Sequence, residues 1–365
     1  LAGSREEWMP RLMAHPEWRT AGVVRRLVAA TTPAVMTMPP DALEMTALST
    51  EIADHLDPAA FTSDTVAHLR GSAWRDRAYA LFYVGLFSDA LCAIDRADLA
   101  FQECMVDKYD RARVAIVRAL CLRAMEDISA AEAAARFSSA TFVEFGDLTR
   151  LASAQLATTH LLFTKGAYDI AFGILEPLER QLQRTGEANI HARVLGNLGY
   201  CLWKLGRVEE ALRYHDASAA LLADLGEHTE AVRVRWNVAS ILATAGRSDE
   251  AQTRLAAVKR SFDDLGMASE SALVSLDIAE LMIAQCDFDA VEDMCRDAMT
   301  SFQQAGISYT ARALTALAYI REAAHHRTVT STLVKHVREY LRRLPRESEL
   351  LFAPPLSDAQ LSSSR

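Results

Sequence analysis

Several features that would assign a function directly are missing from this sequence of 365 residues. It has no apolar run near the roughly 18–20 residues that a membrane-spanning helix needs, and its first ten residues lack the apolar segment of a signal peptide. Positive charge is not in excess either, since the formal net charge is −9. That balance argues against direct binding to the phosphates of nucleic acid.

Paired cysteines and catalytic motifs are also lacking. The six cysteines have no C-x-x-C spacing and mostly fall inside apolar helical patterns, so we interpret them as reduced thiols of a cytoplasmic protein. The sequence contains no phosphate-binding loop, dinucleotide-binding glycine motif, zinc-protease motif or serine nucleophile motif. We therefore predict no enzyme activity, no cofactor and no metal site.

What the sequence does have is a ladder of glycines. Glycine recurs every forty residues, at positions 146, 186, 226, 266 and 306. A second series falls halfway between, at positions 166, 206 and 246, and Cys286 takes its next rung. Because glycine accepts the left-handed conformation that closes a helix, each rung predicts a helix end. The repeating unit is therefore a pair of helices, with about twenty residues per helix and turn.

Apolar residues recur with the same period. The first helix of successive units carries Val194, Leu198, Cys201 and Leu202, then Val234, Val238, Ile241 and Leu242, then Val274, Ile278, Leu281 and Met282. The second helix carries the small or branched series Ala171, Ala211, Ala251 and Val291, and the larger series Leu182, Leu222, Phe262 and Phe302. Each series marks one face of an α-helix. Neither helix can bury its face alone, so neighbouring units must stack.

The segment "LGYCLWKLGRVEEAL" resembles a tetratricopeptide repeat, with Leu198, Gly199, Leu202, Gly206 and Ala211 at the signature positions. The period of forty, in place of the usual thirty-four, resembles the longer variant found in bacterial sensor and regulator proteins. The resemblance implies an all-α, right-handed superhelical solenoid of about seven helical hairpins. It also implies that the first helix of each hairpin lines the concave surface.

The ends of the chain are less regular. We predict an irregular helical segment over residues 1–61, which is either a diverged repeat or a docking region, and a solenoid over residues 62–345. In the first segment, two helices are expected on either side of "TTPAVMTMPP", because its prolines oppose a continuous helix. Residues 346–365 are rich in Pro and Ser and are predicted to be mostly disordered.

The histidines have structural interpretations. His215 aligns with core-facing positions of other units, so we expect a satisfied buried or half-buried imidazole there and not a ligand. His325, His326 and His336 gather near the end of the last unit, where a polar helix end is favoured over a metal site. An enzyme inside the solenoid would need titratable groups on several first helices, and only Glu280 and His160 occupy such positions.

An Arg–Asn pair recurs in the first helices of two neighbouring units, as "RVLGN" and "RVRWN". The residues predicted to line the concave face and bind a partner are Arg193, Asn197, Tyr200, Trp203, Lys204, Arg233, Trp236 and Asn237. Asparagine can both donate to and accept from a peptide backbone, and arginine can bind a carboxylate. The resemblance supports this interpretation, because peptide-clamping members of the family use asparagine and basic residues at matching places. The alternative is a solvated face inherited by duplication, with no ligand.

We therefore expect a regulatory, intracellular scaffold that binds another protein or a peptide, through an extended segment or a helix in its groove. Nucleic acid and membrane are not expected as partners. One alternative is the ligand-sensing region of a larger transcriptional or signalling regulator, whose effector domain lies outside this chain. The absence of an initial methionine favours that alternative. A further alternative is a homo-oligomer formed by stacking of open solenoid ends.

Overall fold

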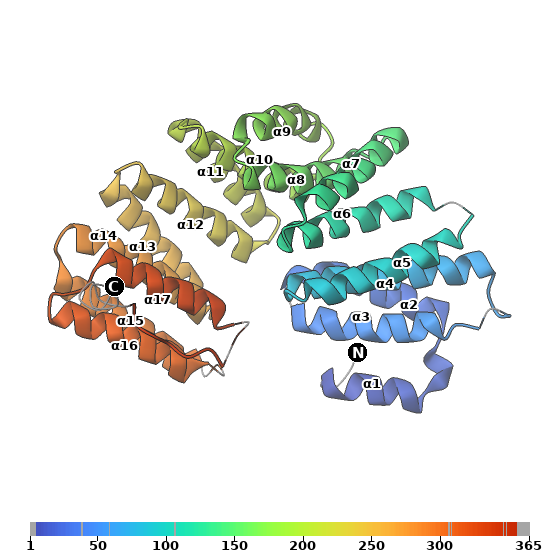
Figure 1. Cartoon of the computed structure of the whole chain (residues 1–365), viewed down its shortest axis with the longest axis horizontal. Helices are drawn as coiled ribbons and strands as arrows, with labels where there is room; N and C mark the ends of the chain where they lie inside the picture. The colour runs from blue at the N-terminus through green and yellow to red at the C-terminus, as the bar shows by residue number, and fades with distance from the viewer. Residues whose placement is uncertain are drawn as a thin grey trace, which may run out of the picture. The chain divides into compact units, whose positions relative to one another are not determined.

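The computed structural model describes residues 5–37, 39–57, 59–105, 107–305, 307, 309–345, 347 and 349–355. Over these residues every regular element is a helix, as Figure 1 shows, and no strand occurs. The all-α class predicted from the sequence is confirmed. None of the helices within these ranges has the length and apolar character needed to cross a membrane.

Helical hairpins follow one another from residue 63 to residue 343. Their first helices are α4 (Ser63–Tyr83), α6 (Lys108–Ala124), α8 (Leu148–Thr164), α10 (Ala188–Lys204), α12 (His228–Thr244), α14 (Ala268–Ala284) and α16 (Thr310–His325). Their second helices are α5 (Phe87–Gln102), α7 (Ile128–Phe145), α9 (Tyr168–Leu182), α11 (Val208–Asp224), α13 (Ser248–Asp264), α15 (Phe288–Ala305) and α17 (Ser331–Arg343). The repeating hairpin predicted from the glycine ladder is thus confirmed.

The turns between these helices share one backbone conformation. A residue with positive φ stands at every twentieth position from 126 to 286, and it is a glycine at all of them except Glu126 and Cys286. At these turns the chain reverses after one residue in the left-handed region, which glycine enters without steric cost. The rung predicted at Gly306 lies outside the described residues.

The core forms where the hairpins stack. The second helices α13 and α15 each pack against the first helix of their own hairpin and against the first helix of the next. The alanine series of the second helices lies in this core, because Ala171, Ala211 and Ala251 are all fully buried. The larger series is buried as well, with Phe262 and Phe302 among the largest fully buried side chains. Burying one such aromatic side chain contributes roughly 1.5–3 kcal/mol.

The chain divides into two compact units, residues 1–190 and 191–365. The first unit begins with α1 (Arg5–Ala14), the short 3-10 helix η1 (Pro16–Trp18), α2 (Ala21–Thr37) and α3 (Pro39–Asp54). Helices α2 and α3 pack on each other and both contact α4. Their shared core joins Val24, Leu48 and Ile52 to Val66 and Leu69 of α4. The N-terminal segment is therefore a helical hairpin packed against the first predicted repeat.

The break between α2 and α3 lies further along the chain than predicted. Helix α2 continues through Pro33 to Thr37, and α3 begins at Pro39. The expectation that the whole segment 31–40 would separate two helices was wrong. A proline within a helix removes one backbone hydrogen bond but does not prevent the helix from continuing, whereas proline is favourable in the first turn of a new helix. The consecutive prolines at 39 and 40 accordingly mark a helix start.

Packed structure continues past residue 345, the predicted end of the solenoid. The ring of Phe352 lies 5.1 Å from that of Tyr340 on α17 and 5.8 Å from that of Tyr319 on α16. Tyr340 Oη donates a hydrogen bond of 3.0 Å to the carbonyl of Leu350. Disorder stays a prediction for residues 356–365, which lie outside the described residues.

Cys286 provides a direct test of the turn geometry. Its φ of 60° places a side chain in the region that disfavours L-residues, and the thiol is exposed, so little packing depends on it. We expect Cys286→Gly to raise the free energy of unfolding by about 1 kcal/mol, measured by urea unfolding followed by circular dichroism. The matched control, Gly246→Ala, should lower it by a similar amount. Equal midpoints for all three proteins would contradict this account.

Candidate functional site

The residues predicted to bind a partner lie on α10 and α12, within the unit formed by residues 191–365. We call this set the α10–α12 stripe. Its exposed members are Arg193, Lys204, Arg233 and Asn237, and its half-buried members are Asn197, Tyr200, Trp203 and Trp236. The two helices share a core, because Ala192 of α10 clusters with Ala231 and Val234 of α12. The stripe therefore joins neighbouring first helices, as the repeat predicted.

Three arginines occupy the same register position in different hairpins: Arg113, Arg193 and Arg233. Two of them pair with an acidic residue one helical turn earlier. Arg113 Nη1 donates to Asp110 Oδ1 at 3.1 Å, and Arg233 Nη1 donates to Glu230 Oε1 at 2.6 Å. Pairs spaced i, i+3 along a helix face each other, so these two cations are compensated within their own helices.

Arg193 differs from the other two. The position one turn before it holds Ile190, which offers no charge. Arg233 also reaches the following hairpin, where Nη2 lies 3.2 Å from Glu270 Oε1, but Glu230, which stands in the same relation to Arg193, engages Arg233 instead. In the described part of the chain the Arg193 guanidinium has no ion pair or hydrogen bond. It is an exposed cation whose fork of donors is available to a carboxylate.

The two asparagines of the stripe are held differently. Asn197 Nδ2 donates to the carbonyl of Arg193 at 2.8 Å, which fixes its side chain along the helix and leaves its Oδ1 as an acceptor. Asn237 is exposed, and no side-chain hydrogen bond of this residue occurs within the described ranges. The side-chain amide of Asn237 can therefore offer both a donor and an acceptor to a bound chain.

An aromatic cluster ends α10. Lys204 Nζ lies 3.9 Å from the ring centroid of Trp203 and 5.4 Å from that of Tyr200, and the two rings meet edge to face at 5.7 Å. Cation–π contact of this kind contributes about 0.5–1 kcal/mol at an exposed site. Trp203 also packs against the core cluster that contains Val238. The cluster is thus a firm, partly apolar surface beside the asparagines.

Trp236 serves the packing of the solenoid. Its Nε1 donates to Asp277 Oδ2 of α14 at 2.6 Å, and its ring meets that of Phe262 edge to face at 5.8 Å. The polar atom of Trp236 is therefore committed inside the chain, and only its half-buried ring can contribute to the stripe.

The C-terminal helix α17 covers the face of α14 that corresponds to the stripe on α10 and α12. Helix α17 packs against α14 as well as α16, and it buries Leu273 and Leu276 in a common core with Val334 and Val337. Leu273 takes the register position of Arg233. Leu276, one turn further along α14, is 1 % exposed and belongs to the same core. The stripe consequently ends at α12.

Ion pairs fix α17 on this face. Arg338 Nη2 lies 2.8 Å from Asp277 Oδ1 and also reaches Glu280, which in turn lies 3.6 Å from Lys335 Nζ. Burial raises the pKa of Asp277, although Arg338 and the Trp236 indole oppose the shift. The contact therefore places a carboxylate in a largely dry environment with one arginine and one indole N–H as its partners.

Sequence reasoning missed a network of buried charges between α4 and α6. Arg75 is 4 % exposed, and its Nε and Nη2 donate to Asp76 Oδ1 at 2.9 and 2.7 Å. Its Nη1 lies 3.7 Å from Asp110 Oδ1, which also accepts from Arg113. Burial lowers the pKa of Arg113, and the neighbouring Arg75 lowers it further. The only feature of the sequence that pointed to this network was that Arg113 occupies the same position in its repeat as Arg193.

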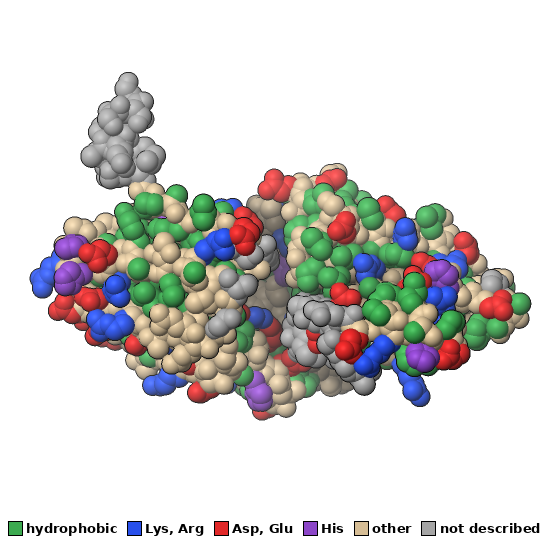
Figure 2. Space-filling model, turned by 90° about the horizontal axis from the view of Figure 1, so that it is seen from below, with side chains coloured by type: hydrophobic (Ala, Val, Ile, Leu, Met, Phe, Trp, Pro, Cys, Tyr) green, Lys and Arg blue, Asp and Glu red, His purple; other side chains and the backbone are tan. Residues whose placement is uncertain are grey.

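Charges elsewhere are interspersed on the surface. Figure 2 shows Lys, Arg, Asp and Glu side chains mixed over the visible face of the described residues, without a large patch of one sign. Local pairs such as Arg207 with Glu210 and Arg247 with Glu250 open second helices, where the acidic partner also complements the helix dipole.

The histidines predicted to mark a polar helix end have separate partners. His325 Nδ1 lies 3.3 Å from Glu292, His326 Nε2 lies 3.0 Å from Glu322, and His336 Nε2 lies 2.7 Å from the carbonyl of Ala353. Among the described residues no three His, Cys, Asp or Glu side chains gather in a geometry that could hold a metal ion. His160 and Glu280, the two inner-face candidates for catalysis, belong to different units.

His215 is buried but not satisfied, contrary to the sequence interpretation. It is 3 % exposed, and neither ring nitrogen has a hydrogen-bond partner. The ring lies directly on α10, where a Cβ added to Gly199 would come within 2.7 Å of His215 Cδ2. The signature glycine is therefore required by this contact. Burial alone lowers the pKa of His215 to about 4 from 6.5, so the ring is neutral near pH 7.

Three of the six cysteines, Cys121, Cys201 and Cys295, are buried as the sequence predicted, whereas Cys92 and Cys286 are exposed. All six are free thiols, and burial raises the pKa of Cys121, Cys201 and Cys295 to about 12. A thiol with so high a pKa is a poor nucleophile and serves as a small apolar side chain.

A family model for the tetratricopeptide repeat matches residues 191–260, which lie within the hairpins α10–α11 and α12–α13. The resemblance identified from the sequence is therefore confirmed at the hairpins that carry the stripe. A search of curated proteins gives no match.

Solved structures share the fold. A signal transduction ATPase with numerous domains and a tetratricopeptide repeat sensor, from Pyrococcus horikoshii, matches with a TM-score of 0.60 and 14% identity, over 90% of this chain and 48% of that one. Aspartyl phosphate phosphatase F from Bacillus subtilis matches at 0.52 and 12%, over 93% and 98%. The Rap conjugation gene regulator of plasmid pLS20, in complex with the Phr* peptide, matches at 0.51 and 12%, over 88% and 96%. These matches identify the chain as a tetratricopeptide-like solenoid.

The buried imidazole predicts a pH dependence of stability. The unfolded chain binds a proton at His215 below pH about 6.5, whereas the folded chain binds it only near pH 4. Above pH 6.5 the ring is neutral in both states, so it does not lower the free energy of unfolding. As the pH falls towards 4, protonation stabilises only the unfolded chain, and the free energy of unfolding falls by up to about 3 kcal/mol. We expect His215→Leu to reduce the loss of unfolding free energy between pH 7 and pH 4.5, measured by urea unfolding.

The matched control is Leu255→Ala at the equivalent position of the next hairpin, because it destabilises the core without removing a titrating group and should leave that pH dependence unchanged. The same loss of stability in wild type and in His215→Leu would contradict the assignment of the acid sensitivity to this ring.

Proposed function

We propose that this chain is a regulatory, intracellular helical-repeat scaffold that binds a segment of another protein or a peptide on the α10–α12 stripe. The observation that carries the proposal is the uncompensated charge of Arg193. Its register equivalents Arg113 and Arg233 are neutralised by acidic residues of their own helices, whereas Arg193 is exposed without a counter-ion in the described part of the chain. A carboxylate on the partner would supply one.

The neighbouring groups suit an extended segment. Asn237 can donate to and accept from a peptide backbone. Asn197 can accept a hydrogen bond from a backbone N–H through its Oδ1, because its Nδ2 is already used. The rings of Tyr200 and Trp203, with Lys204 above them, offer an apolar surface beside a second cation. Backbone contacts would hold the segment, and Arg193 would select one with an acidic side chain or a terminal carboxylate.

Helix α17 is a precedent within this chain for a segment bound on a first-helix face, although it binds as a helix. It is an amphipathic helix that already occupies the equivalent face of α14 within the same chain, with apolar contacts to Leu273 and Leu276 and an ion pair to Asp277. A first-helix face of this solenoid can thus bind a segment by combining apolar contact with charge. Relatives in fold support it as well, since one matched structure is a regulator in complex with a peptide.

A second candidate function is the ligand-sensing region of a larger regulator. The matched Pyrococcus horikoshii protein is named as an ATPase with a tetratricopeptide repeat sensor, and this chain spans 48% of its length. In that case the stripe would bind the signal, and an effector domain outside this chain would respond. Another matched structure is a phosphatase, so the fold is compatible with hydrolysis as well as with binding. The cytoplasmic location remains part of the proposal because all six cysteines are free.

The proposal is tested by capturing partners from a lysate of the native cell. We expect wild type to retain a partner that is lost by a variant with Arg193→Ala, Asn197→Ala, Arg233→Ala and Asn237→Ala. Removing a charge-assisted contact weakens binding by about tenfold or more, so Arg193→Ala alone should raise the Kd by at least that factor in a titration with the captured partner. Arg233→Ala should raise it less, because Arg233 is already paired.

The matched control is Arg213→Ala, which removes an exposed arginine from the second helix α11 of the same hairpin. It should bind as wild type does. Circular dichroism must show equal helicity for all variants. If the fourfold variant retains every partner of wild type, the stripe is a relic of duplication.

A further inference from the structure

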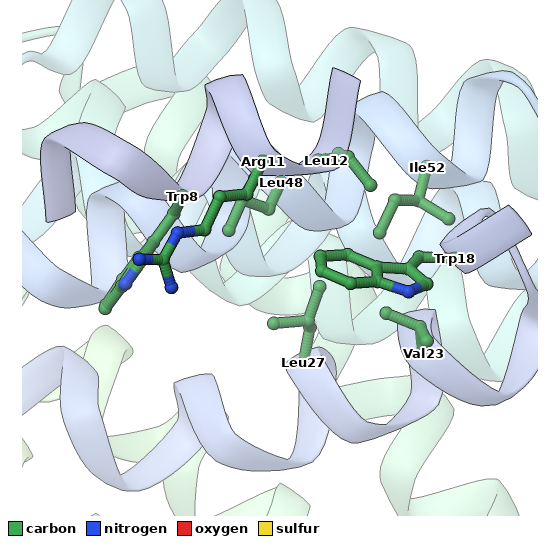
Figure 3. A pocket seen from close by; sticks show the side chains of 8 residues that line it. All are labelled: Trp8, Arg11, Leu12, Trp18, Val23, Leu27, Leu48 and Ile52. Atoms are coloured by element: carbon green, nitrogen blue, oxygen red, sulfur yellow. The ribbon is translucent and has the colours of Figure 1, made fainter. Parts of the chain in front are cut away.

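A cavity of about 300 Å³ lies among the N-terminal helices, far along the sequence from the stripe (Figure 3). Helices α1, η1, α2 and α3 all contribute to its wall. The wall is aliphatic and almost fully buried, since Leu12, Leu27, Leu48 and Ile52 are exposed by 4, 7, 3 and 1 %. Its volume falls at the lower end of the roughly 300–1,000 Å³ range of small-molecule sites.

Among the described residues, the polar side-chain groups that line the cavity are hydrogen-bond donors. They are the indole N–H groups of Trp8 and Trp18 and the guanidinium of Arg11. Figure 3 shows Trp8 and Arg11 together at one end of the cavity, with Trp18 at the other end between Ile52 and Val23. The Trp8 Nε1 atom is buried and has no acceptor within the described ranges. A buried donor without a partner is unfavourable by about 1–3 kcal/mol, so this end of the cavity favours an occupant that brings an acceptor.

Arg11 adds charge at the same end. It lies 2.6 Å from Glu7 Oε2, and the Glu7 side chain is 52 % exposed, so this ion pair lies towards solvent. A guanidinium has five N–H donors and can serve a second carboxylate beside Glu7. No acidic side chain is among the residues that line the cavity in the described part of the chain. The described side chains that line the cavity therefore offer donors to an anionic head group, and the Glu7 carboxylate lies on the solvent side of Arg11.

The wall of the cavity formed by α1 is a short helix with few packing partners. Helix α1 has ten residues with Pro10 among them, a length at which an isolated helix is marginal, and it packs chiefly on α3. The hairpin α2–α3 beneath it is anchored to α4 through the shared core. Movement of α1 can therefore open the cavity without disturbing the repeats.

We propose that this cavity binds a small amphiphile with an apolar chain and a carboxylate head group. The chain lies between Trp18 and the aliphatic wall, and the carboxylate accepts from Trp8 Nε1 and Arg11. A neutral alcohol of the same length lacks the charge that Arg11 selects, and a cationic amphiphile is repelled by the Arg11 guanidinium. The site is independent of partner binding at the stripe, because its residues belong to the other unit.

The test uses decanoate and decan-1-ol, both below the concentration at which decanoate forms micelles, with the full chain. Isothermal titration calorimetry should show one decanoate bound per chain, with a change in tryptophan fluorescence that is smaller in Trp8→Phe, where only Trp18 of the two lining indoles still reports on binding. Decan-1-ol should bind at least about tenfold more weakly, since a hydrogen bond to a charged group contributes about 1.5–3 kcal/mol. Arg11→Gln should weaken decanoate by about tenfold and leave decan-1-ol unchanged.

Two controls keep the test decisive. Arg26→Gln removes an exposed arginine of α2 that does not line the cavity, and it should bind decanoate as wild type does. Val23→Phe should fill the cavity and abolish binding of both probes while circular dichroism confirms the fold. The proposal is overturned if decanoate does not bind to wild type, if decan-1-ol binds as tightly as decanoate, or if Val23→Phe binds decanoate normally.

Discussion

The left-handed residue that ends each helix is the constraint on which the rest of the structure depends. It recurs at every twentieth position from 126 to 286, so all helices in this range have nearly the same length and all turns reverse the chain in the same way. Equal helices and equal turns bring corresponding residues of successive hairpins into register. Only then can a column of alanines allow close approach in one hairpin after another, as Ala171, Ala211 and Ala251 do.

Register also lets one position acquire different roles. Arg113 belongs to a buried charge network, Arg233 bridges two hairpins, and Arg193 is left exposed, although all three stand at the same place in the repeat. The residue one turn earlier decides between these outcomes, since an acid there compensates the charge and Ile190 does not. Specificity in such an array is therefore set by neighbours within the helix as much as by the repeated residue itself.

The architecture was predictable from the sequence because the signals are local and repeated. A glycine that ends a helix and an apolar face that spans one helix are both visible within a few turns of chain, and forty-residue repetition reinforces them. The assignment of single residues within the stripe was less complete. Trp236 was predicted at a binding surface, but its indole N–H is taken by Asp277, a residue forty-one positions away.

The parts that could not be predicted depend on contacts between distant segments. Nothing near Leu276 indicates that a C-terminal helix will cover it, and nothing near His215 indicates that its ring will press on Gly199 without a hydrogen-bond partner. The cavity beneath α1 also needs four segments, each ordinary in sequence, to leave a space between them. Side-chain packing of this kind has no periodic signature.

The contact between Asp277, Arg338 and Trp236 has a consequence for how the solenoid opens. Asp277 receives the indole N–H of α12 at 2.6 Å and the guanidinium of α17 at 2.8 Å, so one carboxylate joins the last three hairpins. Fraying of the C-terminal helix would leave that carboxylate buried without its cation, which is strongly unfavourable. The end of the array is therefore expected to unfold as one cooperative block, and not hairpin by hairpin from the free end.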